Sequence, residues 1–238
     1  MITIDEAAAP RPVPRSGAER AAATLARAFH DDPVARYIRP DDGGRLRWLR
    51  VVFGVMVRFC HLYGKTEEVD DFGGVALWVT PEHGRTTVWH YLRANGVALG
   101  VHSPPAVQRR GVRFLAASEA SQGRCVQGPH WYLPFLGVDP ALQGRGLGSA
   151  LLRGVLEEAD RAGLACYLDA PSERTRRYYE RHGFRAVDAW TVGRDGPGFR
   201  SHRAYVVPRQ GLGGSWCSRR FHVSSGQRAR PQPEARRS

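Results

Sequence analysis

The chain has 238 residues, and 35 lysine and arginine residues against 23 acidic residues give it a net charge of +12. At about 150 residues per domain, this length favours one elaborated domain over two. A content of 42% hydrophobic and 10% aromatic residues is enough to bury a core, which excludes a chain that is disordered throughout. No apolar stretch approaches the roughly 20 residues of a membrane-spanning helix, and the acidic start is unlike a secretory signal. We therefore expect a soluble, cytoplasmic protein without a membrane partner.

The positive charge is only a weak indication of nucleic-acid binding. Lys65 is the single lysine, so nearly all the basic residues are arginine, as a GC-rich coding bias would also produce. Residues 209–238 hold seven arginines and one glutamate and carry +6 of the net charge. The rest of the chain is mildly basic, so nucleic acid is not the expected partner.

The four cysteines do not form a pattern that binds metal. Cys60, Cys125, Cys166 and Cys217 are scattered, with no Cys-x-x-Cys pair and no histidine at a zinc-finger spacing. Scattered cysteines of this kind are typical of reduced, buried thiols. We expect no metal site.

The first elements of the chain are helical. Residues 1–14 hold three prolines and an alanine run, which predicts a flexible leader. A helix is expected over 18–29, and the segment His30-Asp31-Asp32-Pro33 ends it, because the residue before a proline is pushed out of the helical region. Apolar residues at spacings of three and four predict a second helix over 44–63.

A strand and a long helical region follow. A strand is predicted over 73–80, where two glycines precede the apolar run 75–79 and Pro81 follows Thr80. From residue 88 to 122 the pattern is mostly helical, with a break at 100–105.

The second half of the chain alternates strands and helices. A buried strand is expected over 131–138, a glycine-rich turn over 143–148, and then a helix with one apolar stripe that ends near Gly163. The remaining elements are a strand over 164–168, a helix from a Ser172 cap to His182 with Gly183 as its left-handed end, and strands over 184–192 and 202–207. This order indicates an α/β fold with a mixed sheet. The Gly-, Ser-, Arg- and Pro-rich segment after Pro208 is predicted to be disordered.

The glycine turn is the most informative segment. Glycines at the start of a helix let backbone N–H groups approach a phosphate, and the helix end adds a partial positive charge. A nucleoside-triphosphate loop is excluded, because no lysine follows Gly148. A dinucleotide site is disfavoured because Ser149 replaces the third glycine, although Asp169 lies near the expected acidic position. A turn that merely connects a strand to a helix stays open as an alternative.

Two spaced motifs carry a resemblance to a known family. Gln143-x-x-Gly146-x-Gly148 resembles the Gln/Arg-x-x-Gly-x-Gly/Ala acyl-CoA signature of the GNAT N-acetyltransferase superfamily, and it likewise stands between a strand and an amphipathic helix. Tyr178-Tyr179-Glu180-Arg181-His182-Gly183-Phe184 is similar to the family's Phe-Tyr-x-x-x-Gly-Phe element. The segment His30–Pro33 resembles many bacterial members. The strong resemblance covers residues 129–192.

The resemblance implies a central mixed sheet flanked by helices, with acetyl-CoA as cosubstrate. The family holds the pantetheine arm between two splayed central strands and the pyrophosphate at the glycine turn. The implied cofactor-binding residues are Leu136, Gly137, Val138, Gln143, Gly144, Arg145, Gly146, Leu147, Gly148, Ser149, Thr175 and Tyr179. Many members have asparagine at the position of Thr175, so this sequence departs from the family there.

Tyr179 is the leading candidate for a catalytic side chain. A thiol has a pKa of about 8.5 and a tyrosine about 10, so the phenol can hydrogen-bond or protonate the departing sulfur. A core tyrosine is the alternative, and Tyr178 is expected to serve in packing. A main-chain donor on the central strand would polarise the thioester carbonyl.

The acceptor should be an amine that attacks directly, after losing a proton to a base or to water. Asp31, Asp32, His130 and Asp169 are the candidates for that base, and each has a structural alternative such as a helix cap. We expect Asp32, Trp78 and His130 to lie near the acceptor.

The sequence therefore predicts a leader over 1–14, one GNAT domain over 15–208 and a basic tail over 209–238. We expect it to transfer an acetyl group from acetyl-CoA to a small-molecule or peptide amine. Three alternatives stay open: transfer of another acyl group, a non-catalytic acyl-CoA sensor, and nucleic-acid binding through the tail. Dimers are common among relatives, which leaves a homodimer open.

Overall fold

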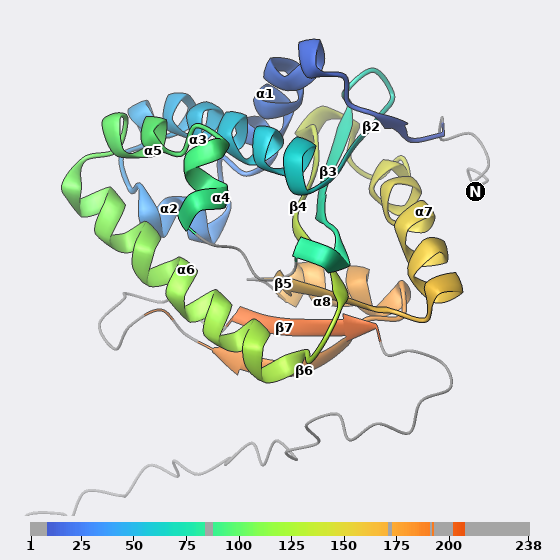
Figure 1. Cartoon of the computed structure of the whole chain (residues 1–238). Helices are drawn as coiled ribbons and strands as arrows, with labels where there is room; N and C mark the ends of the chain where they lie inside the picture. Colours follow the sequence, from blue (N-terminus) through green and yellow to red (C-terminus); the bar gives the residue numbers. More distant parts are fainter. Residues whose placement is uncertain (1–8, 84–87, 171–172, 191, 193–201, 208–238) are drawn as a thin grey trace, which may run out of the picture.

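The computed structural model describes residues 9–83, 88–170, 173–190, 192 and 202–207. Their strands form one seven-stranded sheet in the order β1-β2-β3-β4-β5-β7-β6. β4 and β5 are parallel, whereas every other neighbouring pair is antiparallel. Figure 1 shows α1 and α3 on one side of the central strands and α7 on the other. The predicted mixed sheet flanked by helices is confirmed.

The chain begins with a short edge strand and three helices. β1 (Arg11–Pro12) pairs with β2, so these residues belong to the sheet, in contrast to the leader expected over 1–14. The predicted helices are confirmed as α1 (Ala18–Ala28) and α3 (Asp42–Tyr63). A further helix, α2 (Pro33–Ile38), was not expected. Pro33 lies after the end of α1 and is the first residue of α2. Proline suits the first position of a helix.

β2 (Gly64–Val69) and β3 (Gly74–Val79) form an antiparallel pair along their whole length. β3 confirms the predicted strand, whereas β2 was missed. β2 follows α3 without a break and carries Lys65, Glu67 and Glu68, so neither a turn nor an apolar run marks it in the sequence.

Three helices connect β3 to its neighbour β4: α4 (Val88–Arg93), α5 (Val97–Val101) and α6 (Pro105–Cys125). Antiparallel neighbours can be joined by a two-residue turn, so this connection is far longer than the sheet needs. α6 crosses the sheet beside β6 and β7 (Figure 1). The helical pattern predicted for 88–122, with its break, is confirmed for the residues that the structure describes.

The second half follows the predicted alternation. Its elements are β4 (His130–Val138), α7 (Leu147–Ala162), β5 (Ala165–Ala170), α8 (Glu173–Arg181), β6 (Arg185–Trp190) and β7 (His202–Val207). Gly163 and Gly183 have φ angles of 61° and 85°, as the predicted left-handed helix ends require. Ser172, Cys217 and the tail over 209–238 lie outside the described residues.

The sheet has an apolar core on each face. On one face Leu25 of α1 and Phe53 of α3 pack with Leu77 of β3. On the other face Leu151 of α7 packs with Trp78 of β3. None of the described helices is both long and apolar enough to cross a bilayer.

Candidate functional site

The two parallel strands at the centre of the sheet pair over only part of their length. The β4–β5 ladder runs from His130↔Ala165 to Leu133↔Leu168. β5 pairs with β7 along its other edge, from Cys166 to Ala170, and residues 135–138 of β4 pair with β3 alone among the described strands. Over this stretch, one backbone edge of β4 therefore faces none of the described strands, and its polar groups are available to a ligand.

An irregularity in β4 lies where the two strands part. Leu77 pairs with Phe135 and Val79 with Tyr132, so Trp78 is opposite two β4 residues, Leu133 and Pro134. A proline has no N–H to donate to a ladder and suits such a bulge. After the bulge, Gly137 lies against α1, where an added Cβ would approach Leu25 within 2.9 Å.

The glycine turn stands directly after the open stretch of β4. Gly144 and Gly146 have φ angles of 84° and 83°, in the left-handed region, and no atom within 4 Å of an added Cβ. Gly146 is the N-cap residue of α7, and as a glycine it offers no side chain to cap the helix. The first N–H groups of α7 therefore point out of the helix without an intrahelical acceptor, which suits an anion.

Side chains on both sides hold the turn in place. Asp139 accepts a hydrogen bond from the Ala141 N–H and pairs with Arg27 of α1 at 2.7 Å, and these contacts lower its pKa. The Gln143 amide donates to the Val138 carbonyl oxygen at 3.3 Å. Arg145 is exposed on the turn. Gln143, the glutamine of the acyl-CoA signature, thus ties the glycine turn to the end of β4 by a hydrogen bond.

The predicted turn residue Ser149 has a partner that the sequence did not indicate. Its Oγ lies 3.0 Å from Nε2 of His182, which follows α8. Burial lowers the pKa of His182, which favours the neutral ring. The first turn of α7 and the end of α8 are therefore joined.

Tyr179 lies on α8 on the same side of the sheet as α7. Its side chain is 9% exposed and contacts the ring of Phe184 edge-on, with centroids 5.6 Å apart. Tyr178, expected to serve in packing, lies against the turn, where its Oη would be 2.7 Å from a Cβ added to Gly148. Thr175 is partly buried on the same helix. The sheet, the turn and α8 thus bring both sequence motifs to one side of the fold.

Asp169 is the first β5 residue beyond the last pair with β4. Its Oδ2 accepts a hydrogen bond from Ser118 at 2.6 Å, and its Oδ1 accepts from Tyr167 at 2.7 Å and from the Trp190 indole at 3.2 Å. Burial raises the pKa of Asp169 to about 6. The sequence indicated Asp169 but none of its three partners, because these residues come together only in the folded chain.

Comparisons with known proteins agree with this geometry. The Acetyltransferase (GNAT) family model matches residues 112–184, which include the open part of β4, the glycine turn and Tyr179. This region belongs to the GNAT acetyltransferase superfamily, as the two motifs predicted. The match indicates an acyltransferase.

Individual GNAT relatives are distant. An uncharacterised N-acetyltransferase of Schizosaccharomyces pombe is 28% identical over 172 residues, 70% of each chain. The structure described as histone acetyltransferase HPA2 and related acetyltransferase from Corynebacterium glutamicum has a TM-score of 0.61 at 22% identity and covers 87% of this chain and 99% of its own. A polyamine N-acetyltransferase from Drosophila melanogaster has a TM-score of 0.54 at 19% identity, with coverages of 83% and 97%. These two structures share the fold.

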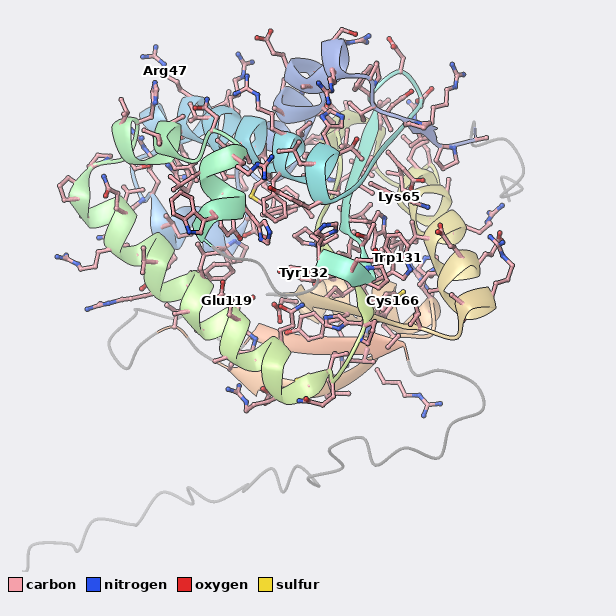
Figure 2. The ribbon with its side chains drawn as sticks, viewed as in Figure 1. Arg47, Lys65, Glu119, Trp131, Tyr132 and Cys166 are labelled. Atoms are coloured by element: carbon pink, nitrogen blue, oxygen red, sulfur yellow. The ribbon has the colours of Figure 1, made fainter. Side chains whose placement is uncertain are left out.

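Trp78, which was expected near the acceptor, is instead a core residue of this GNAT fold. It is 0% exposed and packs edge-on against Trp131, with centroids 6.3 Å apart. The Lys65 ammonium lies 5.1 Å from the centre of the Trp131 ring (Figure 2). It also pairs with Glu158 of α7. Alternation along β3 turns Trp78 toward α7, so the expectation that it lines an open pocket is wrong.

Asp32 and His130 have structural partners in the fold. Asp32 caps α2 by accepting hydrogen bonds from the N–H groups of Val34 at 2.8 Å and Ala35 at 3.4 Å. His130 is 6% exposed, and its two ring nitrogens lie 2.9 Å from the Gln122 amide and 2.8 Å from the Gly128 carbonyl oxygen. Burial lowers the pKa of His130. Asp31 is exposed and pairs with Arg36 at 2.6 Å.

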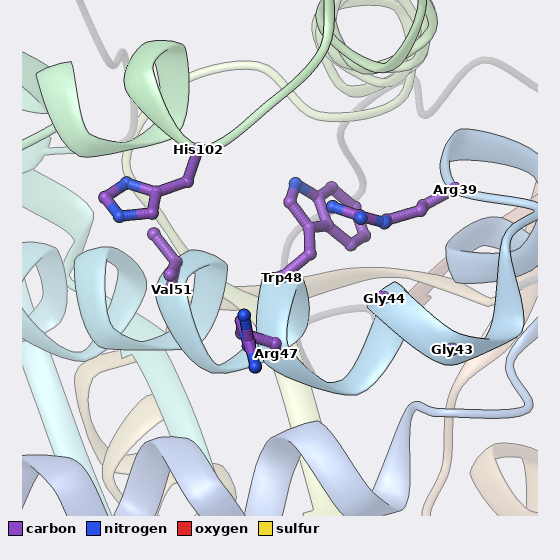
Figure 3. A pocket seen from close by; sticks show the side chains of 7 residues that line it. All are labelled: Arg39, Gly43, Gly44, Arg47, Trp48, Val51 and His102. Atoms are coloured by element: carbon purple, nitrogen blue, oxygen red, sulfur yellow. The ribbon is translucent and has the colours of Figure 1, made fainter.

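A hollow of about 310 Å³ lies elsewhere, at the start of α3 and below the α5–α6 connection (Figure 3). Its lining includes two arginines, a histidine and a tryptophan among its seven residues. The residues are Arg39, Gly43, Gly44, Arg47, Trp48, Val51 and His102. None of them belongs to β4, β5, α7 or α8, so the hollow is separate from the glycine turn.

Three of the four cysteines lie in the described part of the chain. Cys60, Cys125 and Cys166 are free thiols, and burial raises the pKa of Cys125 to about 11. Within the described ranges, the structure holds no group of three His, Cys, Asp or Glu side chains placed to bind a metal.

Proposed function

We propose that this GNAT protein transfers an acetyl group from acetyl-CoA to a primary amine. The observation that carries the proposal is the parting of β4 from β5 after Leu133 and Leu168, which exposes a backbone edge that leads to the glycine turn. An extended amide-containing chain suits the edge, and a pyrophosphate suits the turn. Acetyl-CoA has both groups in this order.

The turn fits a bound anion on two structural grounds. Gly144 and Gly146 leave open the space that a side chain would fill, and the N-cap residue of α7, Gly146, has no side chain to cap the helix. We assign the pyrophosphate to the N–H groups of residues 144 and 146–148, with Arg145 and the Ser149 hydroxyl as further contacts. The backbone of residues 136–138 would take the pantetheine arm, and Thr175 would contact the same ligand. Acetyl-CoA supplies the acetyl group as an activated thioester.

Tyr179 is assigned as the general acid. It comes from α8, on the α7 side of the sheet, which supports a place beside the sulfur. The attacking amine forms the new N–C bond, the C–S bond breaks, and the sulfur takes the phenolic proton. The phenol regains a proton from solvent, and the proton released by the amine passes to a base or to water.

The acceptor is assigned to the class of small amines. The Drosophila neighbour is described as forming N-acetylagmatine, and another neighbour of TM-score 0.50, 20% identical, is an agmatine N-acetyltransferase. These neighbours support an alkyl amine as acceptor. A peptide amine is the alternative, because the Corynebacterium neighbour is described as a histone acetyltransferase.

A thermal-shift measurement tests the cosubstrate. Ligand at about 100 times its Kd adds about 2.7 kcal/mol of stability, and each kcal/mol raises Tm by about 2–4 °C for a chain of this size. We expect acetyl-CoA and CoA each to raise Tm by several degrees, and NAD and ATP to leave it unchanged. No shift with either CoA species would contradict the proposed site.

A turnover assay tests the reaction. Free CoA thiol is followed with acetyl-CoA and a panel of amines, and the acetylated product is identified by mass. Faster turnover with propionyl-CoA or succinyl-CoA would favour transfer of another acyl group. Binding of acetyl-CoA without turnover of any amine would favour a sensor.

A further inference from the structure

We propose that the Asp169 carboxylate, set beside the rings of Tyr167 and Trp190, binds the positively charged amine of the acceptor. This inference rests on the proposed acetyl transfer and adds the place and chemistry of acceptor recognition. It assigns the acceptor to the face of the sheet that α6 covers, opposite the face that α7 and Tyr179 cover.

The position of Asp169 follows from the strand register. Leu168 makes the last pair with β4, so Asp169 begins the part of β5 that has parted from it. Leu168 and Ala170 lie in the core beneath α7, so alternation turns Asp169 to the other face. That side chain contacts Ser118 of α6. A group bound at Asp169 would therefore lie at the head of the gap assigned to the pantetheine arm, across the sheet from α7.

The charge of Asp169 has only neutral partners among the described side chains. A hydroxyl, a phenol and an indole donate to it, and none of them is a cation. A carboxylate has about four acceptor positions, two on each oxygen. Oδ1 accepts two of these hydrogen bonds and Oδ2 accepts one, so Oδ2 can take one more donor. An ammonium N–H would fill this position and neutralise the charge.

A neighbouring acidic residue shows the contrast. Asp188 on β6 also faces α6, but it pairs with Arg124 at 2.6 Å and accepts a hydrogen bond from Ser121 at 3.1 Å. α6 thus supplies a cation to Asp188 and only a hydroxyl to Asp169. Of these two carboxylates, the one at the gap is the one without a cation among the described side chains.

Aromatic rings surround this carboxylate. The ring of Tyr132 lies 5.6 Å from that of Tyr167, and Phe114 of α6 lies 5.6 Å from Trp190. Figure 2 shows Tyr132 on the α6 side of β4, whereas Trp131 lies on the α7 side. Aromatic faces attract cations, which adds to the preference for a protonated amine. The set also suits the carbon chain of an alkyl or arylalkyl amine.

The test replaces Asp169 by its neutral isostere and follows acceptor and cosubstrate separately. Agmatine and phenethylamine are the acceptors, and acetyl-CoA affinity is measured by calorimetry. In D169N we expect KM for both amines to rise about ten- to hundredfold, because a hydrogen bond to a charged group is lost. The Kd of acetyl-CoA should stay within about twofold. D188N is the matched control, and its amine KM should stay within about twofold.

A charge-specific measurement separates recognition from a structural role. Phenethylamine and neutral 2-phenylethanol are compared as ligands of the complex with CoA. The wild-type protein should bind the amine more tightly than the alcohol, and D169N should lose this preference. A D169N protein that binds acetyl-CoA but keeps the wild-type KM and preference would overturn the inference and leave the proposed function intact. A wild-type protein that binds acetyl-CoA but neither amine would overturn it as well. Failure of wild-type protein to bind acetyl-CoA would instead overturn the proposed function.

Discussion

The Ser149 hydroxyl and the His182 ring join two helices at the glycine turn, through a contact of 3.0 Å. Ser149 is in the first turn of α7, and His182 immediately follows α8, so residues 33 positions apart meet beside the segment assigned to the pyrophosphate. A neutral His182 can fix the direction of the hydroxyl, which matters if the hydroxyl donates to a phosphate oxygen.

This contact predicts non-additive effects on cosubstrate binding. S149A and H182A should each raise the Kd of acetyl-CoA by about three- to tenfold, because each removes the oriented hydroxyl donor. The double variant should be no weaker than either single variant. Calorimetric Kd values for the four proteins measure the coupling. Additive losses would mean that the two side chains act independently.

Gly146→Ala tests the left-handed turn. An L side chain at a φ of 83° is strained by about 1–2 kcal/mol, and the added Cβ enters the space assigned to the pyrophosphate. We expect a lower Tm and a Kd for acetyl-CoA that rises about tenfold or more. Gly154→Ala is the control, because Gly154 is exposed on α7 with no atom within 4 Å of an added Cβ. The control should gain about 0.5–1 kcal/mol of stability and keep its affinity.

Tyr179→Phe tests the general acid. The variant keeps the ring that packs against Phe184, so Tm and the Kd of acetyl-CoA should change little. Its kcat should fall by about 10²-fold or more, as loss of a general acid does. Tyr178→Phe, one residue earlier, should retain kcat within a small factor. Equal kcat values in wild-type and Tyr179→Phe proteins would remove Tyr179 from the mechanism.

Asp32 is expected to act on stability and not on the acceptor. Asp32→Ala removes the α2 cap and should cost about 1 kcal/mol, whereas Asp32→Asn keeps a capping oxygen and should cost only a few tenths. Unfolding in urea measures both changes. The KM for the amine should be unchanged in both variants. A raised KM in Asp32→Asn alone would return Asp32 to the acceptor site.

Asp169 should make stability depend on pH. Burial raises its pKa from 3.8 to about 6, so the folded state holds the proton more tightly than the unfolded chain. The stability that this group adds is complete below about pH 4 and is lost as the pH rises through about 6. Because D169N does not titrate, wild-type stability should fall relative to D169N by at most about 3 kcal/mol between pH 4 and 7. Ser118, Tyr167, Trp190 and Asp188 surround the group and stay unchanged in this comparison. Parallel stability curves would contradict the raised pKa.

Local patterns predicted most of the elements. The apolar stripes of α1, α3 and α7 and the glycines at 146, 163 and 183 are short-range signals, because each depends on residues within a turn or two. β2 and α2 were missed for equally local reasons. β2 is polar and follows a helix without a break, and α2 is a single short helix opened by a proline.

The side-chain arrangement around the site could be predicted only in part. The two motifs indicated the glycine turn and Tyr179, because their residues are close in sequence. Ser118 and Asp169 are 51 positions apart and meet only because α6 crosses the sheet. Trp78 was misplaced because the sequence does not say which face of β3 is covered by α7. The side of a strand that a helix covers, and contacts between residues far apart in the chain, depend on tertiary packing. Local sequence patterns do not reveal them.

The parting of β4 and β5 also bears on hydrogen exchange. Backbone amides of residues 135–138 that turn away from β3 have no partner among the described strands, although β4 is a central strand of the seven-stranded sheet. Their protons should exchange with deuterated solvent with little protection, while the amides of residues 130–133 that point into the β4–β5 ladder exchange slowly. The middle of the sheet thus contains a strand that is rigid at one end and solvent-labile at the other.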